Sequence, residues 1–547
     1  MFYPILFLDY AEYHSKIFIF NNLFHNSRIH SFLLKSFIIC IFPSHLIILY
    51  YFISKFIPRK IKENSYNNAP NFGLLVGMDV TGKNVYISEK GLYQNILITG
   101  SIGSGKTASA MYPFTKQLIN HNANDINKKL CFLILDVKGN YYSKVLDFAH
   151  KCNRLKDVIV IQVNGRYKYN PLDKPYLKSS VLANRLKMIL LLFSPNNSES
   201  YWLDKVEQIL ECCINLCRIY NHGYVTFSEL HKLVVNQSYY RKVIRKIRKT
   251  FYSGKLSKEE CYLLLSSISF LENDYYSLDS RTYNILKSEI TRITNCFIAD
   301  YEINKTFCPT KSEQNFYGFT EVIDKGKIVV LNMNLSHYKN LSKIIAAYLK
   351  LDFQTDVLNQ LSNSSTVRRP SVFISDEYQE YVTSSDADFF SQSREAKCIN
   401  IVSTQSYTSI LNSLNNVNST KVIIQNLVNK LWFRTDDIFT IEEIQKQIGK
   451  IEKDKVSRTI SENSKESYYS PLNNDFISLN SSISESINTY SQNDFKYDYN
   501  FFTQHLNTFS CISFLSNGNQ ILNPSNINMV PYFYTKSKKG GYYEKKK

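Results

Sequence analysis

The feature that most constrains this chain is the segment QNILITGSIGSGKTASAMYPF at residues 94–114. An apolar strand at residues 95–99 runs into the loop GSIGSGKT, residues 100–107, and then into a helical pattern. Glycines in such a loop permit turns that a Cβ would forbid, so successive N–H groups can converge on phosphate oxygens at a helix N-terminus. The sequence therefore predicts a strand–loop–helix unit of an α/β fold that binds phosphate.

Each polar residue of this loop has an expected role in nucleotide binding. Lys106 would place its ammonium against the β- and γ-phosphates, and Thr107 would offer its hydroxyl to Mg²⁺. An accidental Gly-rich turn is the alternative, but the chain has only 17 glycines, which makes a chance match rare. The sequence thus predicts ATP and Mg²⁺ as cofactors, held by Gly100, Ser101, Gly103, Ser104, Gly105, Lys106 and Thr107.

A pair of acids follows a second apolar strand in SVFISDEYQEYV, residues 371–382. Open parallel sheets place ligands at the carboxyl ends of their strands, which is where Asp376 and Glu377 fall. Asp376 would hold Mg²⁺ through its waters, and Glu377 would orient and polarise the attacking water. An exposed acidic turn is the alternative. Asp136, which ends an earlier apolar strand, is a weaker metal candidate because no Glu follows it.

Two further catalytic candidates flank a third strand in the segment SREAKCINIVSTQS, residues 393–406. Gln405 ends the strand at 398–404, where it could contact the γ-phosphate and report its presence. Arg394, on a helix before that strand, could instead reach the phosphate of a neighbouring subunit.

Periodicity divides the chain into regions. Buried strand patterns occur at 130–140, 158–163 and 326–335, whereas residues 175–315 follow a helical period with few strand signals. Residues 459–500 are rich in Ser, Asn and Tyr with weak periodicity, which predicts a mobile insertion or linker. A final hairpin is expected around Asn517-Gly518. The expected divisions are an α/β domain in three parts, 63–174, 316–458 and 501–536; an inserted all-α domain, 175–315; the insertion, 459–500; and a basic tail, 537–547.

Residues 1–62 are expected to anchor the chain in a membrane. The stretch at 36–54 contains no Asp, Glu, Lys or Arg, and as a helix it would span about 28 Å, close to the thickness of a bilayer core. Four basic residues follow at once and would hold this end on the cytoplasmic side: Lys55, Arg59, Lys60 and Lys62. Pro43 and His45 interrupt the stretch, so a buried core helix is the alternative.

The charge of the chain indicates an acidic partner. The net charge is +18, which suits nucleic acid or anionic lipid, although Lys and Asn are also favoured by AT-rich codons. Six basic residues and no acid occur in RKVIRKIRK, residues 241–249. A solvated helix face and a contact with nucleic acid or an acidic partner both explain this run.

In order and spacing, these motifs resemble the TraG-like coupling-protein ATPases of type IV secretion and bacterial conjugation. The resemblance runs from about residue 70 to 535 and rests on GSIGSGKT, LDVKG at 135–139, YNPLD at 169–173, YW at 201–202, SDEYQEY at 375–381 and SREAKCINIVSTQS. It implies a RecA-like motor domain with an all-α substrate-recognition domain, anchored in the bacterial inner membrane with the motor in the cytoplasm. A homo-hexameric ring would use ATP to pass single-stranded DNA with its relaxase, or an effector protein, to a secretion channel.

The resemblance also implies site roles. Lys106, Thr107, Asp376 and Glu377 keep those given above, Arg394 matches the trans-acting arginine of the family, and Gln405 matches its motif glutamine. The family shows two N-terminal spans where this chain has one convincing stretch, and the insertion after residue 459 has no counterpart.

Two other functions fit the same motifs. A DNA pump of the FtsK or HerA type would act on duplex DNA, and a docking receptor would use nucleotide only to stabilise its ring. The helical insertion and the apolar N-terminal stretch favour the coupling protein over the duplex pump, and an intact Glu377 favours turnover over a receptor.

Overall fold

The computed structural model describes residues 72–136, 138–193, 200–362, 368–463, 468–477, 482–536 and 542–544, and the single residues 31 and 35. Among these residues, no helix combines the length and the apolar character needed to cross a membrane. The expected span at 36–54 and the rest of the anchoring region lie outside the described residues.

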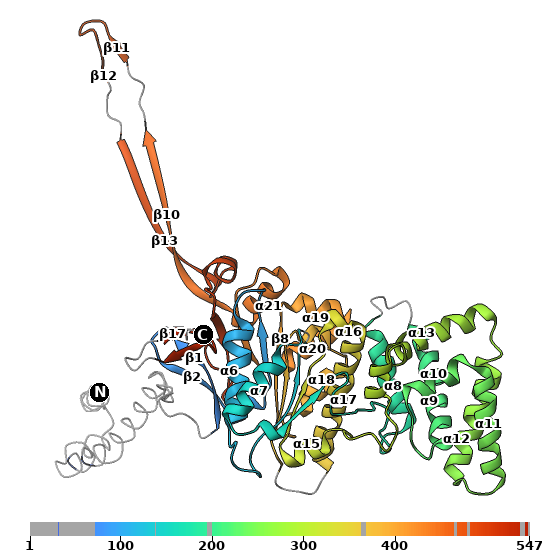
Figure 1. The fold of residues 1–547 in the computed structure, drawn as a ribbon. Coiled ribbons are helices and arrows are strands. Elements are labelled where there is room, and N and C mark those ends of the chain that lie inside the picture. Colours follow the sequence, from blue (N-terminus) through green and yellow to red (C-terminus); the bar gives the residue numbers. More distant parts are fainter. Residues whose placement is uncertain are drawn as a thin grey trace, which may run out of the picture. The chain divides into compact units, whose positions relative to one another are not determined.

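An 11-stranded sheet forms the centre of the fold, in the order β2-β1-β15-β14-β9-β3-β8-β7-β4-β6-β5 (Figure 1). The run from β9 to β5 is parallel, and the strands on the other side of β9 are antiparallel. The predicted α/β fold is thus confirmed. The strands are β1 Gly73–Asp79, β2 Asn84–Ser88, β3 Ile96–Thr99, β4 Cys131–Leu135, β5 Val158–Ile161, β6 Ile328–Leu331, β7 Ser371–Ser375, β8 Cys398–Thr404, β9 Asn429–Trp432, β14 Ser510–Phe514 and β15 Ser525–Asn528.

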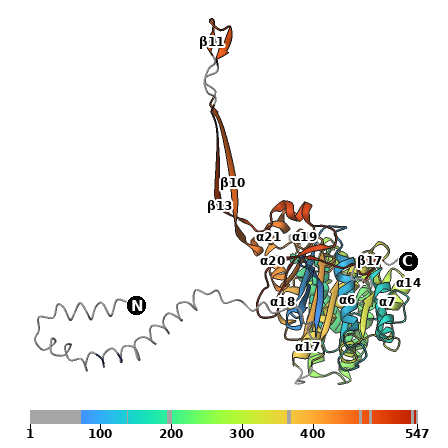
Figure 2. The same cartoon turned by 90° about the vertical axis from the view of Figure 1, so that its left-hand side faces the viewer.

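Helices cover both faces of the parallel strands, as their continuous apolar sequences require. On β3, Ile96 and Ile98 pack in one core with α6 and α7, while Leu97 packs in the other core with α17 (Figure 2). The helices around the sheet are α5 Glu89–Leu92, α6 Tyr112–Asn120, α7 Tyr141–Lys151, α15 Thr320–Lys325, α16 Leu335–Tyr338, α17 Asn340–Ser362, α18 Asp386–Gln392, α19 Tyr407–Leu414, α20 Val417–Asn426 and α21 Ile438–Ile448.

The order of the strands brings three carboxyl ends to one edge. Strand β8 lies between β3 and β7, with Thr404 beside Thr99 and Val402 beside Ser375. Because the three strands are parallel, the residues that follow each of them meet at that edge.

The region between β5 and β6 is helical, as the 3.6-residue period predicts. The described residues between 179 and 307 form helices and no strands. The apolar faces of these helices share one core with α17. The helices are α8 Ser179–Leu191, α9 Ser200–Tyr220, α10 Phe227–Val235, α11 Gln237–Tyr252, α12 Lys258–Phe270, α13 Ser280–Ile298 and α14 Tyr301–Phe307.

Residues 459–500, predicted from the sequence as a mobile insertion or linker, contain regular strands in most of their described part. Strands β10, Lys450–Asn463, and β13, Ser482–Phe495, pair antiparallel along their whole length and run side by side in both views (Figures 1 and 2). A second short pair, β11 Tyr468–Ser470 and β12 Asp475–Ile477, follows along the chain. Most of the described side chains of the ribbon are exposed and none of them is buried, so no alternation of apolar and polar residues is needed, and the sequence pattern gave no strand signal.

The predicted C-terminal hairpin is confirmed. β14 and β15 pair antiparallel, Asn517 donates its N–H to the carbonyl of Gln520 at 3.2 Å, and Gly518 takes a φ of +95° in the turn. In the basic tail, β17 Tyr542–Glu544 pairs with β16 Tyr534–Lys536, and the remaining tail residues lie outside the described residues.

Candidate nucleotide site

The loop after β3 has a backbone that requires glycine. Gly105 has a φ of +98°, and a Cβ there would lie 2.5 Å from the ring of Phe509. The Ser104 hydroxyl donates to the carbonyl of Ser101 at 2.8 Å, and the N–H of Ser101 donates to the carbonyl of Arg434 at 2.8 Å. The expected helix follows, beginning as one π-helical turn, Thr107–Met111, before α6. The loop is therefore braced from β9 and β14, two strands that lie far along the chain.

Lys106 points back along this loop. Its ammonium donates to the carbonyls of Gly100 and Ser101, the latter at 3.1 Å. Its side chain is buried, and this burial lowers the pKa of Lys106, while the carboxylates of Glu377 and Asp376 oppose the shift. The cation thus lies inside the loop, next to the two candidate acids.

The loop and the acid pair meet, as the sequence predicts. The Thr107 hydroxyl donates to Asp376 at 3.2 Å across a separation of 269 positions in the chain. Asp376 is nearly fully buried, and burial raises its pKa, whereas a hydrogen bond from the hydroxyl of Ser403 acts in the opposite direction. A hydroxyl and a carboxylate side by side are oxygen ligands of the kind that Mg²⁺ takes.

Glu377 is held from two sides. One carboxylate oxygen accepts from the side-chain amides of Gln379 at 2.8 Å and Gln405 at 3.1 Å, and the other pairs with Lys138 at 3.2 Å. Burial alone would raise the pKa of Glu377, but the hydrogen bond from Gln379, the charge of Lys138 and the bond from Gln405 outweigh it and lower the pKa. Glu377 is therefore ionised at neutral pH, and Gln405, predicted to contact the γ-phosphate, lies beside it.

Comparisons with known proteins bear on the fold that carries this arrangement. No protein-family model and no curated protein matches the chain. A solved structure of the bacterial conjugative coupling protein TrwBΔN70, unbound, is 11% identical, covers 83% of this chain and 88% of its own, and gives a TM-score of 0.54. The plasmid coupling protein TrwB in complex with ADP and Mg²⁺ is 10% identical, with 83% and 89% covered and a TM-score of 0.53.

This chain shares its fold with a conjugative coupling protein. The structure of VirB4 of Thermoanaerobacter pseudethanolicus is also similar, at 14% identity, with 84% and 97% covered and a TM-score of 0.47.

Within the coupling-protein fold, Lys138 is a site residue that the motif analysis left without a role. It belongs to the LDVKG motif, which follows β4, the strand next to β7. Burial lowers the pKa of Lys138, but the charges of Asp376 and Glu377 outweigh burial and leave the pKa raised. Its pairing with Glu377 depends on β4 lying beside β7, which no local pattern reveals.

Asp136, the weaker metal candidate, stabilises the turn of the LDVKG motif at residues 135–139. Its two oxygens accept the backbone N–H groups of Lys138, Asn140 and Tyr141, each at 3.0 Å. These bonds occupy its carboxylate in shaping the loop.

Arg394 lies away from these residues. The helix expected to carry it ends at Gln392, and Arg394 is exposed in the turn before β8, whereas Gln405 follows the other end of that strand. Seven residues of strand span roughly 20 Å. Arg394 therefore lies at the opposite edge of the sheet from the phosphate loop of its own chain.

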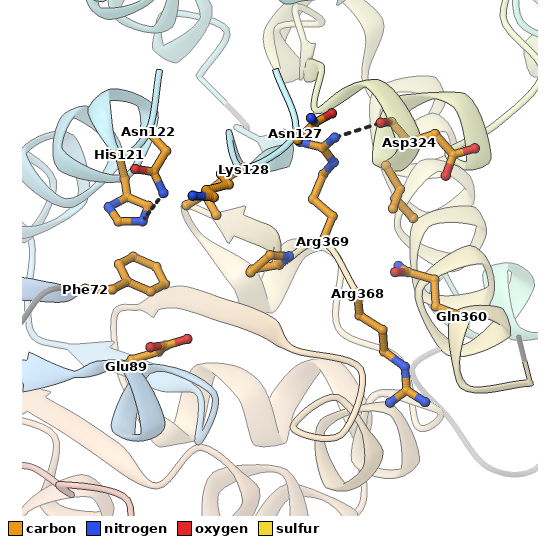
Figure 3. Close-up of a pocket in the computed structure, with 13 residues that line it drawn as sticks. Phe72, Glu89, His121, Asn122, Asn127, Lys128, Asp324, Gln360, Arg368 and Arg369 are labelled. Atoms are coloured by element: carbon orange, nitrogen blue, oxygen red, sulfur yellow. Dashed lines mark hydrogen bonds between the residues drawn. The ribbon is translucent and has the colours of Figure 1, made fainter. Parts of the chain in front are cut away.

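A cavity of about 680 Å³ lies at that opposite edge, near the residues that precede β4 and β7. Figure 3 shows Arg369 in its wall beside Asp324. Arg369 donates to the carbonyls of Lys129 at 2.6 Å, Ile126 at 3.0 Å and Asp324 at 2.9 Å, and Arg368 donates to the carbonyl of Glu395 at 2.9 Å. These arginines brace the main chain. Because the cavity lies at the edge of the sheet opposite the phosphate loop, it is separate from the nucleotide site.

Proposed function

We propose that this protein is a membrane-anchored ATPase that couples a substrate to a type IV secretion or conjugation channel and drives its transfer by hydrolysing ATP. The observation that carries the proposal is the contact of Thr107 with Asp376, beside Lys106 and Glu377, at the carboxyl edge of a parallel sheet. TrwB, which shares the fold, has been solved with ADP and Mg²⁺ and with a non-hydrolysable ATP analogue.

The residues at this edge fit ATP and Mg²⁺. The loop supplies backbone N–H groups, Gly105 allows the left-handed turn that a Cβ against Phe509 would prevent, and Lys106 supplies a cation for the phosphates. Thr107 and Asp376 would hold Mg²⁺, which supplies charge neutralisation during phosphoryl transfer. Glu377, ionised and fixed by Gln405 and Lys138, would orient the attacking water and accept hydrogen bonds from it.

The basic helix α11 supports nucleic acid as part of the cargo. Its apolar residues face the helical core, and six cations lie exposed on the other side: Arg241, Lys242, Arg245, Lys246, Arg248 and Lys249. We propose single-stranded DNA with its relaxase, or an effector protein, as the substrate, and channel components as partners.

Assembly and location complete the proposal. In a homo-hexamer, Arg394 of one subunit would reach the nucleotide of the next, which is consistent with its exposure and its distance from its own phosphate loop. Residues 36–54 would anchor the ring in the bacterial inner membrane, with the motor domain in the cytoplasm.

Two alternative functions can be distinguished from this one by a single experiment. A duplex DNA pump of the FtsK or HerA type would share the nucleotide edge, but the helical region between β5 and β6 favours a coupling protein. A docking receptor that does not hydrolyse ATP would have no need of an ionised glutamate fixed beside the loop.

The test is the ATPase rate of the full chain in detergent, with and without single-stranded or duplex DNA. We expect hydrolysis without DNA and severalfold stimulation by single-stranded DNA. Stronger stimulation by duplex DNA would favour the pump, and an absence of hydrolysis under all conditions would favour the receptor.

A further inference from the structure

The backbone of Glu377 is strained and needs support from its surroundings. Its φ of +52° is in the left-handed region, which a residue with a Cβ adopts at an energetic cost. The segment that follows, Tyr378–Asp386, is where that support lies. Tyr378, the next residue, is fully buried, and its hydroxyl donates to Asp386 at 2.6 Å.

Lys350 of α17 fastens the same segment at three points. Its ammonium donates to the carbonyl of Tyr381 at 2.6 Å, to the hydroxyl of Thr383 at 2.9 Å and to Asp386 at 2.7 Å. Lys350 and Asp386 are both completely buried. The other oxygen of Asp386 accepts from the amide of Gln354, one turn further along α17, at 2.9 Å. The carboxylate is therefore fully satisfied.

A buried ion pair is a poor way to gain stability, because desolvation offsets much of the attraction. It does, however, fix directions, since each donor and acceptor has one good geometry. Here those directions link the residue after Glu377 to a long core helix. We propose that Lys350, Asp386 and Tyr378 are positioning residues, which hold Glu377 in its left-handed conformation with its carboxylate between Lys138 and Gln405. The proposal rests on ATP hydrolysis at this site.

The same helix carries a second buried cluster that serves as a matched control. Asp352, two residues after Lys350, pairs with Lys174 and Arg185, each at 2.7 Å, and accepts a hydrogen bond from the hydroxyl of Tyr169. Tyr169 and Tyr378 are both fully buried and both donate to a buried aspartate. Only Tyr378 adjoins the candidate catalytic residue.

The experiment compares Tyr378→Phe with Tyr169→Phe in the full chain. Both variants lose one buried hydroxyl, so a similar drop in melting temperature is expected for each. Nucleotide affinity should be unchanged in both, but kcat should fall roughly tenfold only in Tyr378→Phe, because misplacing a catalytic group slows the chemical step. Equal kcat values in the two variants, with Glu377→Gln still inactive, would overturn the positioning role.

A double variant separates positioning from an independent effect. If Tyr378 acts only through Glu377, then Tyr378→Phe combined with Glu377→Gln should hydrolyse ATP no more slowly than Glu377→Gln alone. A further tenfold loss in the double variant would contradict the proposal. A wild-type protein that does not hydrolyse ATP would instead overturn the proposed function and this inference with it, whereas a Glu377→Gln variant at the wild-type rate would overturn this inference alone.

Discussion

The nucleotide edge of the sheet and the β10–β13 ribbon are built in opposite ways. At the edge, Thr107 contacts a residue 269 positions away, and every residue of β3, β7 and β8 is buried. In the ribbon, each strand pairs with a near neighbour in sequence, most of the described side chains are exposed, and none of them is buried. An arrangement fixed by packing from many sides should respond strongly to single changes, whereas an exposed, self-contained element should not.

The largest effect is expected at Glu377. Glu377→Gln keeps the shape of the side chain but removes the charge that orients the attacking water, so hydrolysis should fall by roughly two orders of magnitude or more. Phosphate release and binding of a fluorescent ATP analogue would show lost turnover with retained binding. Glu321→Gln, exposed on α15 and paired with Lys325, is the control and should hydrolyse normally. A wild-type rate in Glu377→Gln would remove Glu377 from the mechanism.

The next effect is expected at Lys106. Lys106→Ala removes the cation next to the phosphates and should weaken nucleotide binding by roughly ten- to a hundredfold, the value of a charge-assisted hydrogen bond. Isothermal titration calorimetry with ADP and Mg²⁺ measures this affinity. Lys116→Ala, at an exposed position on α6, is the matched control. Unchanged affinity in Lys106→Ala would show that the loop does not hold the phosphates.

Variants of Arg394 test whether the nucleotide site of one subunit includes a residue of the neighbouring subunit. Arg394→Ala alone should lower hydrolysis, and mixing it with Lys106→Ala protein should partly restore the rate, because some interfaces would then pair an intact loop with an intact arginine. Lys397→Ala, in the same exposed turn, controls for loss of surface charge. No rescue at any mixing ratio would place Arg394 outside the mechanism.

The basic face of α11 should show a smaller, salt-dependent effect. Neutralising four of its exposed cations should reduce the slope of log affinity for DNA against log salt by up to about 3. The changes are Arg245→Gln, Lys246→Gln, Arg248→Gln and Lys249→Gln. Neutralising Lys255 and Lys258, exposed beyond that helix, should alter the slope less. An unchanged slope in the fourfold variant would show that these cations of α11 do not contact DNA and form only a solvated surface.

The smallest effect is expected in the ribbon. Replacing residues 452–493 by an Asn-Gly turn should leave the ATPase rate within about twofold of wild type, because β10 and β13 pair only with each other in the described residues. The base of the ribbon stays fixed by Gln445, whose side-chain amide donates to the carbonyl of Tyr497 at 3.1 Å. A tenfold loss of activity would mean that the ribbon acts on the site, and the contrast drawn above would fail.

The parts of the site that the sequence predicts share one property, which is that each lies on a segment that follows the carboxyl end of an apolar strand. Parallel strands align their carboxyl ends, so Thr107, Asp376 and Gln405 could be expected together before their contacts were known. Lys138 could not, because its role depends on β4 lying beside β7. The support of Glu377 by Lys350 was equally hidden, since it joins the middle of a helix to a turn.

The strands of the ribbon could not be predicted from the sequence pattern. Its strands consist largely of Ser, Asn, Thr and charged residues, a composition that also suits a linker, and only main-chain pairing distinguishes the two. Arg394, in contrast, could be assigned to the far edge in advance, because it precedes its strand rather than following it.

Strand β8 has a consequence for the proposed ring. One end of it carries Gln405 against Glu377, and the other end begins just after the turn that holds Arg394. The strand is hydrogen-bonded on both sides, to β3 and to β7. In the proposed ring, this one strand would therefore connect the nucleotide of its own subunit with the arginine presented to the next subunit.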